Sequence, residues 1–98
     1  MNRKECLEAA GKAVLTDRET DYGSPEDTFR DIADLWTSYL HFPITPKKVS
    51  NMMILLKIAK TNYGDKDDNY VDIAGYAACA AEIGTGKRIP VGIGGKYE

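Results

Sequence analysis

Apolar residues recur at the spacing of amphipathic helices in four segments of the chain, and no segment alternates as a strand would. Helices are expected at about residues 3–16, 25–40, 46–61 and 68–83. Two of them have clear starts, because Ser24-Pro25 and Thr45-Pro46 each place a capping hydroxyl before a proline at the first helical position. Gly84 is expected to follow the last helix as its terminating residue. The pattern predicts an all-α fold, a four-helix bundle-like domain.

The third and fourth helices have unusual surfaces. Between Met52 and Leu56 the third helix is apolar on nearly every side, which predicts that it is the most buried helix. The fourth has Gly75 among alanines, and a glycine inside a helix costs up to about 1 kcal/mol relative to alanine. Close approach of another helix at Gly75 would offset that cost. In so short a chain, these two helices predict that a partner subunit completes the core, giving a homo-oligomer that is at least a dimer.

The length and composition fit one globular domain. The chain has 98 residues, of which 43% are hydrophobic and 29% charged, so it has enough apolar material for a modest core. Residues 1–86 are expected to form a single all-α domain. Residues 87–98 contain the glycine-rich run Gly92 to Gly95 and are expected to form a C-terminal tail.

The charge and the cysteines exclude several classes of partner. A net charge of −2 gives no push toward nucleic acid or an anionic membrane. No apolar run approaches the roughly 20 residues of a membrane span, and the first residues lack the apolar region of a signal peptide. Cys6 and Cys79 have no metal-ligand spacing and fall in apolar helical patterns, which favours reduced, buried thiols. These features predict a cytoplasmic protein.

Candidate chemistry begins at the start of the fourth helix. Asp68 and Asp72 stand four residues apart, so both carboxylates lie on one helix face, and Asn69 flanks them. Like charges at this spacing repel modestly, a cost that binding of Mg²⁺ through converging oxygens would explain. The alternative is that Asp67 or Asp68 caps the helix and that Asp72 is an ordinary polar position.

Lysines interrupt the apolar third helix. Lys57 stands between Leu56 and Ile58, and Lys60 follows one turn later. Both ammonium groups could extend to water along the surface. A lysine surrounded by apolar residues is more often paired, so a carboxylate or a phosphate is the favoured partner of Lys57.

The second helix carries an acidic row and several aromatic residues. Asp27, Asp31 and Asp34 recur on one face, and such a row is most often solvated. Across a helix contact, Glu26, Asp27 or Asp31 could add carboxylates to those of the fourth helix. Aromatic residues could stack on a base, but at helical spacing they more often belong to a core. The aromatic candidates are Tyr22, Trp36 and Tyr76.

The segments Tyr22 to Phe29, Ile32 to Trp36, Met52 to Lys60 and Asp67 to Ala77 resemble a family of small phage and prophage proteins of unknown function. That family is distantly similar to the MazG-like all-α nucleoside triphosphate pyrophosphatases. The resemblance implies a helical oligomer in which acidic residues on two helices hold Mg²⁺, and it implies hydrolysis of a nucleoside triphosphate to monophosphate and pyrophosphate.

The MazG-like pattern is only partly present. Its last core helix carries Glu-x-x-Asp, and here Asp72 matches the Asp while Asn69 stands where Glu is expected. The earlier Glu-x-x-Glu motif falls where this chain has Lys57 and Lys60. The residues expected to bind metal are Asp68, Asp72, Glu26 and Asp31, and those expected to bind substrate are Lys57, Lys60, Asn69 and Tyr76.

Three hypotheses follow. The protein is a MazG-like enzyme or enzyme-derived protein acting on nucleotides, a non-catalytic helical module that binds a nucleotide or a host or phage protein, or a structural oligomer in which Asp72 pairs with Lys57. Two or more carboxylates that face solvent without lysine partners favour the enzyme. A closed ion pair between Asp72 and Lys57 favours the structural oligomer.

Overall fold

The computed structural model describes residues 1–17 and 25–85 of the chain. The described residues contain helices and no strand, so the all-α prediction is confirmed. The α-helices are α1 (Arg3–Lys12), α3 (Pro25–Leu40), α4 (Pro46–Lys60) and α5 (Asp67–Thr85). A π-helix, η1 (Ala13–Asp17), continues α1, and a 3-10 turn, η2 (Thr61–Tyr63), follows α4.

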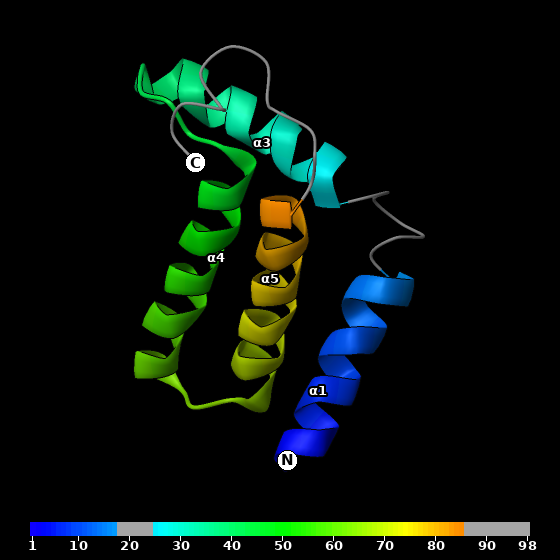
Figure 1. Cartoon of the computed structure of the whole chain (residues 1–98). Coiled ribbons are helices and arrows are strands. Elements are labelled where there is room, and N and C mark those ends of the chain that lie inside the picture. The colour runs from blue at the N-terminus through cyan, green and yellow to red at the C-terminus, as the bar shows by residue number, and fades with distance from the viewer. Residues whose placement is uncertain (18–24, 86–98) are drawn as a thin grey trace.

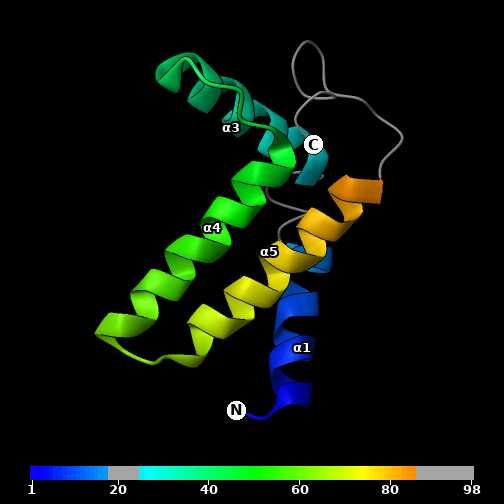
Figure 2. The same cartoon turned by 60° about the vertical axis from the view of Figure 1, so that its left-hand side comes forward.

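Helix α5 is the central element of the arrangement. It forms an antiparallel hairpin with α4 and also contacts α1 and α3 (Figure 1). Helix α1 lies along the side of α5 away from α4, and α3 crosses the end of the hairpin opposite to the η2 turn (Figures 1 and 2). The small side chains of α5 allow these three helices to approach it closely.

The helix starts follow from local sequence. Asn2 and Glu5 form a capping box, in which each side chain accepts a hydrogen bond from the other's backbone N–H at 2.8 Å. Thr45 caps α4 by accepting from Lys48 N at 3.2 Å, and Pro46 occupies the first helical position, as predicted. Ser24, the expected cap of α3, lies outside the described residues.

The connection between α3 and α4 is fixed by one side chain. The hydroxyl of Thr37 accepts a hydrogen bond from Ile44 N at 2.9 Å and donates to Ile44 O at 3.1 Å. The chain reverses at His41, which has a φ of 55°. Position and orientation of the α4 start are therefore set by bonds to α3.

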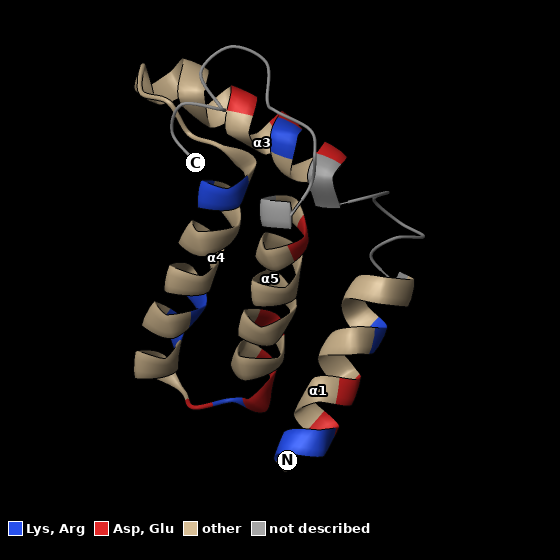
Figure 3. Cartoon of the chain, in the orientation of Figure 1, with Lys and Arg blue, Asp and Glu red and all other residues tan. Residues whose placement is uncertain are grey.

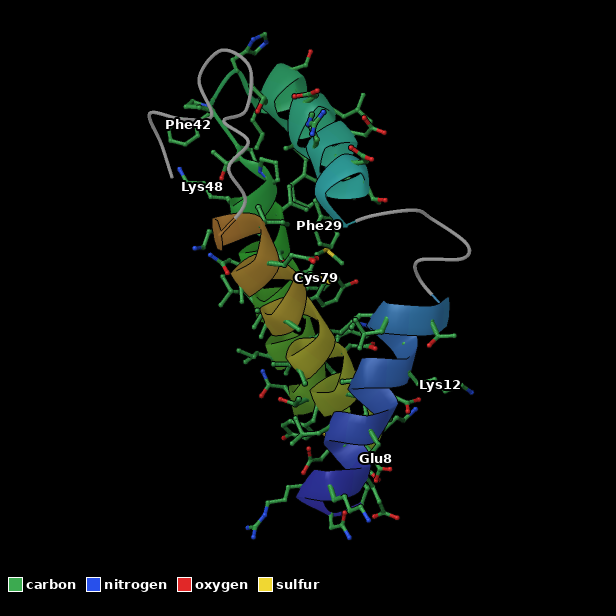
Figure 4. All side chains as sticks on the ribbon, turned by 45° about the vertical axis from the view of Figure 1, so that its right-hand side comes forward. Glu8, Lys12, Phe29, Phe42, Lys48 and Cys79 are labelled. Atoms are coloured by element: carbon green, nitrogen blue, oxygen red, sulfur yellow. The ribbon has the colours of Figure 1, made fainter. Side chains whose placement is uncertain are left out.

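The core lies where α3 meets α4 and α5. Phe29 and Val49 are fully buried there, and the ring of Tyr76 lies 6.2 Å from that of Phe29. The buried cluster comprises Phe29, Ala33, Ile44, Val49, Cys79 and Ile83, with Trp36 among the residues packed against it. Figure 4 shows Phe29 and Cys79 close together between α3 and α5. Cys6 and Cys79 are both free thiols, as the sequence predicted, but only Cys79 is buried, whereas Cys6 is partly exposed.

The close approach predicted at Gly75 is confirmed. A Cβ atom built on Gly75 would lie 3.0 Å from Cγ1 of Val14, a residue of the π-helix η1. The sequence predicted one continuous helix to about residue 16, whereas the α-helical part ends at Lys12 and a wider π turn follows. The π turn was not predicted, because its apolar positions continue the helical spacing.

Two expectations about helices are wrong for the single chain. Helix α5 runs through Gly84 to Thr85, so Gly84 does not end it. Helix α4 is not covered on all sides, because Leu55 is 63% exposed and Met52, Leu56 and Ile58 are also exposed. Only the face of α4 toward α5 and α3 is buried, as Val49 and Ser50 show.

Two further expectations concern the C-terminal tail and the absence of a membrane span. The C-terminal tail, residues 87–98, lies outside the described part of the chain. Among the helices that the structure describes, none is long and apolar enough to span a bilayer.

Candidate functional site

A hollow of about 460 Å³ lies at the turn between α4 and α5, and lysines from both sides of the turn line it. Its lining residues are Lys57, Lys60, Tyr63, Gly64, Lys66, Asp68, Asn69 and Asp72. The turn follows α4 in Figure 3 as a succession of red and blue segments. Five of the residues predicted from the sequence to bind metal or substrate therefore lie together: Lys57, Lys60, Asp68, Asn69 and Asp72.

The central contact of the hollow joins α4 to α5. Lys57 Nζ lies 2.8 Å from Asp72 Oδ2. The hydrogen bond to Asp72 raises the pKa of Lys57 above its ordinary value, and this effect outweighs the opposing effect of burial. The Lys57 side chain is 17% exposed and that of Asp72 is 41% exposed, so the aliphatic stem of the lysine is packed while the pair remains open to water. The predicted pairing of Lys57 with a carboxylate is confirmed.

The remaining charges of the hollow are not balanced by such a contact. Within the described residues, neither Lys60 nor Lys66 lies within 4.0 Å of a carboxylate. The remaining carboxylate of the hollow belongs to Asp68, which is exposed. After the pair of Lys57 and Asp72 is set aside, two ammonium groups face one carboxylate. The side chains that line the hollow therefore carry a net positive charge, whereas Asp65 and Asp67 of the same turn do not line it.

Asn69 holds the turn rather than pointing freely into the hollow. Its side-chain amide donates to Gly64 O at 3.4 Å, and its backbone N–H donates to Lys66 O at 3.1 Å. Asn69 is buried, and these bonds fix the segment that carries Lys66 against the start of α5. Tyr70 adds a second bond, because its hydroxyl donates to Asp65 and this raises the pKa of the phenol.

Tyr76 does not line the lysine-lined hollow, although it follows Asp72 by one helical turn. It lines a smaller cavity of about 100 Å³ between α5 and the α1–η1 segment, together with Val14, Val71 and Cys79. Asp72 lines both spaces. The structure therefore does not bring Tyr76 into the lysine-lined hollow; its ring packs against the core.

The acidic residues of α3 do not join the carboxylates of α5. Asp31 is exposed on α3, which crosses the far end of the hairpin from the hollow (Figure 1). Asp27 forms a 3.6 Å ion pair with Arg30 of its own helix. The side chain of Glu26 lies outside the described residues. Across the described part of the chain, no three Asp, Glu, His or Cys side chains form a group that could hold a metal ion.

Three lining residues, Tyr63, Gly64 and Lys66, were not predicted from the sequence. Lys66 and Tyr63 fall in a loop between two helices, and loop positions carry no periodicity from which to place them. The available signal was proximity along the chain. A short turn between antiparallel helices brings its own residues back beside the last turn of one helix and the first turn of the next.

Known proteins match most of the chain. The family model described as a domain of unknown function, DUF6378, matches residues 5–84. The gene 55 protein of Mycobacterium phage D29 is 41% identical over 81 residues, which cover 82% of this chain and 54% of that protein. The gene 55 protein of Mycobacterium phage L5 is 42% identical over 73 residues, covering 72% of this chain and 47% of that protein.

The chain thus spans about half the length of these phage relatives. No solved structure matches it. The expected likeness to a small phage protein family of unknown function is confirmed by these matches, while they provide no support for the more distant likeness to MazG-like enzymes. With a match over residues 5–84, the chain belongs to the DUF6378 family of phage-related domains.

Proposed function

We propose that the lysine-lined hollow binds the phosphate groups of a nucleotide. The observation that supports this is the convergence of Lys57, Lys60 and Lys66, from α4 and from the following turn, on one solvent-open space. Lysine is a compact point charge that commonly binds phosphate. A space of about 460 Å³ also falls within the size range of small-molecule sites.

The ion pair positions one of these cations. Asp72 holds the ammonium group of Lys57 at the wall of the hollow, at 2.8 Å, and so limits the freedom that the lysine side chain would lose on binding phosphate. Lys60 and Lys66 are exposed and stand at the hollow's edge. Their ammonium groups attract the negative phosphates, which Lys57 alone would attract only weakly because Asp72 already balances its charge.

Mg²⁺ is compatible with the hollow only as a companion of the phosphates. Asp68 and Asp72 offer two carboxylates one helical turn apart, and Mg²⁺ is commonly bound by one or two carboxylates together with water and substrate phosphates. Among the described residues no third carboxylate lines the hollow, and Asp31 lies on α3, at the far end of the hairpin. Lys57 also competes with the metal for Asp72. We therefore propose phosphate binding as the primary activity and hydrolysis of a triphosphate as an additional step to be tested.

Thermal unfolding with a panel of nucleoside mono-, di- and triphosphates, each with and without Mg²⁺, tests the proposal. A ligand that binds only the folded protein at about 100 times its Kd stabilises the fold by about 2.7 kcal/mol. We expect at least one nucleotide to raise the Tm of the wild type, and the double variant Lys60→Gln/Lys66→Gln to lose that rise. Lys12→Gln is the matched control, because Lys12 lies on α1 and projects away from α5 (Figure 4).

The outcomes separate the alternatives. No rise in Tm with any nucleotide, or an equal rise in the double variant and the control, would contradict binding at the hollow. Pyrophosphate release, measured on any nucleotide that binds, decides whether the protein also hydrolyses it. Binding without release identifies a nucleotide-binding module.

A second candidate function is that of a non-catalytic helical oligomer that binds a host or phage protein. The closed pair of Lys57 and Asp72 favours it, because this pair occupies the carboxylate that the enzyme hypothesis needs. The exposed apolar face of α4 favours it as well. Unchanged stability in every nucleotide, together with an oligomer in solution, would support this candidate.

A further inference from the structure

The outer face of α4 is an uncharged apolar strip. Met52, Leu55, Leu56 and Ala59 follow one another at i, i+3, i+4 and i+7, the spacing of residues on one side of a helix, and all four are exposed. We call these four residues the α4 strip. Ile58, also exposed, flanks it. Large apolar residues exposed in a row on one helix mark an interaction surface more often than scattered ones do.

The charges of α4 are distributed unevenly around this strip. Every charged residue of α4 is a lysine. Lys57 and Lys60 line the hollow. Lys47 and Lys48 lie in the first turn, where the helix macrodipole disfavours cations, so the dipole does not explain their presence. The opposite end of the hairpin carries the acidic turn, which holds Asp65, Asp67 and Asp68 around Lys66 (Figure 3).

We propose that a second copy of this chain packs on the α4 strip, with the two α4 helices antiparallel. In that arrangement the two-fold axis passes near Leu55 and Leu56, and the Lys47–Lys48 end of one copy meets the acidic turn of the other. A parallel arrangement would instead place Lys47 and Lys48 beside their own counterparts. Complementary charge at both ends therefore favours the antiparallel pair.

A second copy fits the strip because the same surface serves on both partners. A two-fold interface is self-complementary, and an uncharged centre flanked by one basic and one acidic end satisfies that condition. A standard interface buries roughly 800 Å² on each partner, more than four side chains of one helix provide. Phe42 extends the exposed apolar surface near Lys48: it is 57% exposed, and its ring centroid lies 5.8 Å from Lys48 Nζ (Figure 4).

This arrangement also concerns the hollow. Tyr63 lines the hollow and is 94% exposed, and it lies one turn beyond the strip. With the axis at Leu55 and Leu56, Lys48 of the partner subunit comes opposite Tyr63. The dimer therefore covers one rim of the hollow and adds a basic group there. This consequence does not depend on nucleotide binding, so dimerisation can be tested separately.

Sedimentation equilibrium of the wild type and of Leu55→Glu tests the proposal. We expect a dimer for the wild type at micromolar concentration. We expect at least about a hundredfold weaker association for Leu55→Glu. The two-fold axis places Leu55 of both copies in the interface, so the substitution removes two buried leucines from each dimer. Leu7→Glu is the matched control, since Leu7 is 66% exposed on α1, away from α4. Circular dichroism establishes that each variant keeps its helices.

A charge swap tests the orientation. Lys47→Glu/Lys48→Glu should weaken the dimer, and adding Asp65→Lys/Asp68→Lys to the same chain should restore it. Asp67 is left unchanged, because it pairs with the Met1 amino group of its own chain at 3.1 Å. Lys47 and Lys48 lie at the start of the 15-residue α4 and the two aspartates follow its other end, about 22 Å away, where salt screens any interaction between these sites within one chain. A monomeric wild type, or a Leu55→Glu variant that associates as tightly as the wild type, would overturn the dimer. A charge swap that fails to restore association would overturn the antiparallel arrangement.

Discussion

Ser50 on α4 is joined to Tyr76 on α5 by a hydrogen bond of 2.7 Å, donated by the serine hydroxyl to the tyrosine main-chain carbonyl. Ser50 is fully buried, so the hydroxyl has no access to bulk water. A buried polar group without a partner costs about 1–3 kcal/mol, and this bond removes that cost. The bond also connects the two helices of the α4–α5 hairpin, on the face of α4 opposite to the α4 strip.

Replacing Ser50 by alanine should lower the free energy of unfolding by about 1 kcal/mol, the usual net value of one hydrogen bond. Removing the hydroxyl leaves the Tyr76 carbonyl with one bond fewer. Urea unfolding followed by circular dichroism measures the change. Ser38→Ala is the control, because Ser38 is exposed on α3, and its effect should stay within about 0.5 kcal/mol. Equal effects for the two variants would contradict this role of Ser50.

The ion pair of Lys57 and Asp72 should contribute a modest coupling energy. A double-mutant cycle with Lys57→Met and Asp72→Asn is expected to give about 1 kcal/mol, the upper range for exposed pairs, because Asp72 is 41% exposed and water weakens the attraction. Cutting the pair should lower the melting temperature in the absence of ligand. A coupling energy indistinguishable from zero would show that the pair has no structural role.

The same pair has a pH dependence of definite sign. Asp72 raises the pKa of Lys57 in the folded protein above 10.5, so the unfolded protein loses this proton first as the pH rises. The stabilisation of the fold by this ion pair is therefore fully present below about pH 10. It is lost as the pH rises through the pKa of Lys57 in the folded protein. Unfolding of the wild type and of Lys57→Met, measured from neutral to strongly alkaline pH, should converge at the alkaline end. A stability difference that grew with pH would contradict this assignment.

Tyr70 should titrate above an ordinary tyrosine, because its hydroxyl donates a hydrogen bond to the Asp65 carboxylate, which also disfavours the negative phenolate. Carbon-13 NMR of labelled tyrosine rings can follow this titration. Asp65→Asn should bring the pKa of Tyr70 back toward its ordinary value of 10.0. An unchanged titration of Tyr70 in Asp65→Asn would contradict this contact.

Gly75 and Val14 should be energetically coupled. Gly75→Ala gains helix propensity of about 1 kcal/mol, but its new methyl group would lie 3.0 Å from Val14 Cγ1. The substitution should therefore be more favourable in a Val14→Ala background than in the wild type. Thermal unfolding of the two single variants and the double variant measures the difference. If the changes in unfolding free energy of the two single variants simply add in the double variant, η1 and α5 move apart without cost and the predicted coupling is absent.

Much of the fold could be predicted because its signals are local. Thr45 before Pro46 marks the start of α4, and Gly75 among alanines marks a close helix contact. The start of α5 was expected one residue late and its end two residues early, since Gly84 resembles a terminating residue although hydrogen bonding continues to Thr85. Glycine permits a helix end but does not require one.

The candidate site could be predicted only in part. The spacing of Lys57, Asp68 and Asp72 placed them on facing sides of two helices, and the pair of Lys57 and Asp72 is present. The sequence could not show that α3 crosses the hairpin at the far end, which separates Asp31 from the hollow. Such crossing angles depend on tertiary packing, here on Phe29 and Thr37, and not on the periodicity of one helix.

The central position of α5 sets a limit on how its sequence can vary among relatives. Gly75, Cys79 and Ala80 are buried where α1, α3 and α4 approach, so larger side chains there would force neighbouring helices apart. Ala77, Ala78 and Ala81 are exposed on the same helix and have no such limit. An alignment of many family members should therefore show side-chain size constrained at the first three positions and free at the other three, even though all six residues are small in this chain.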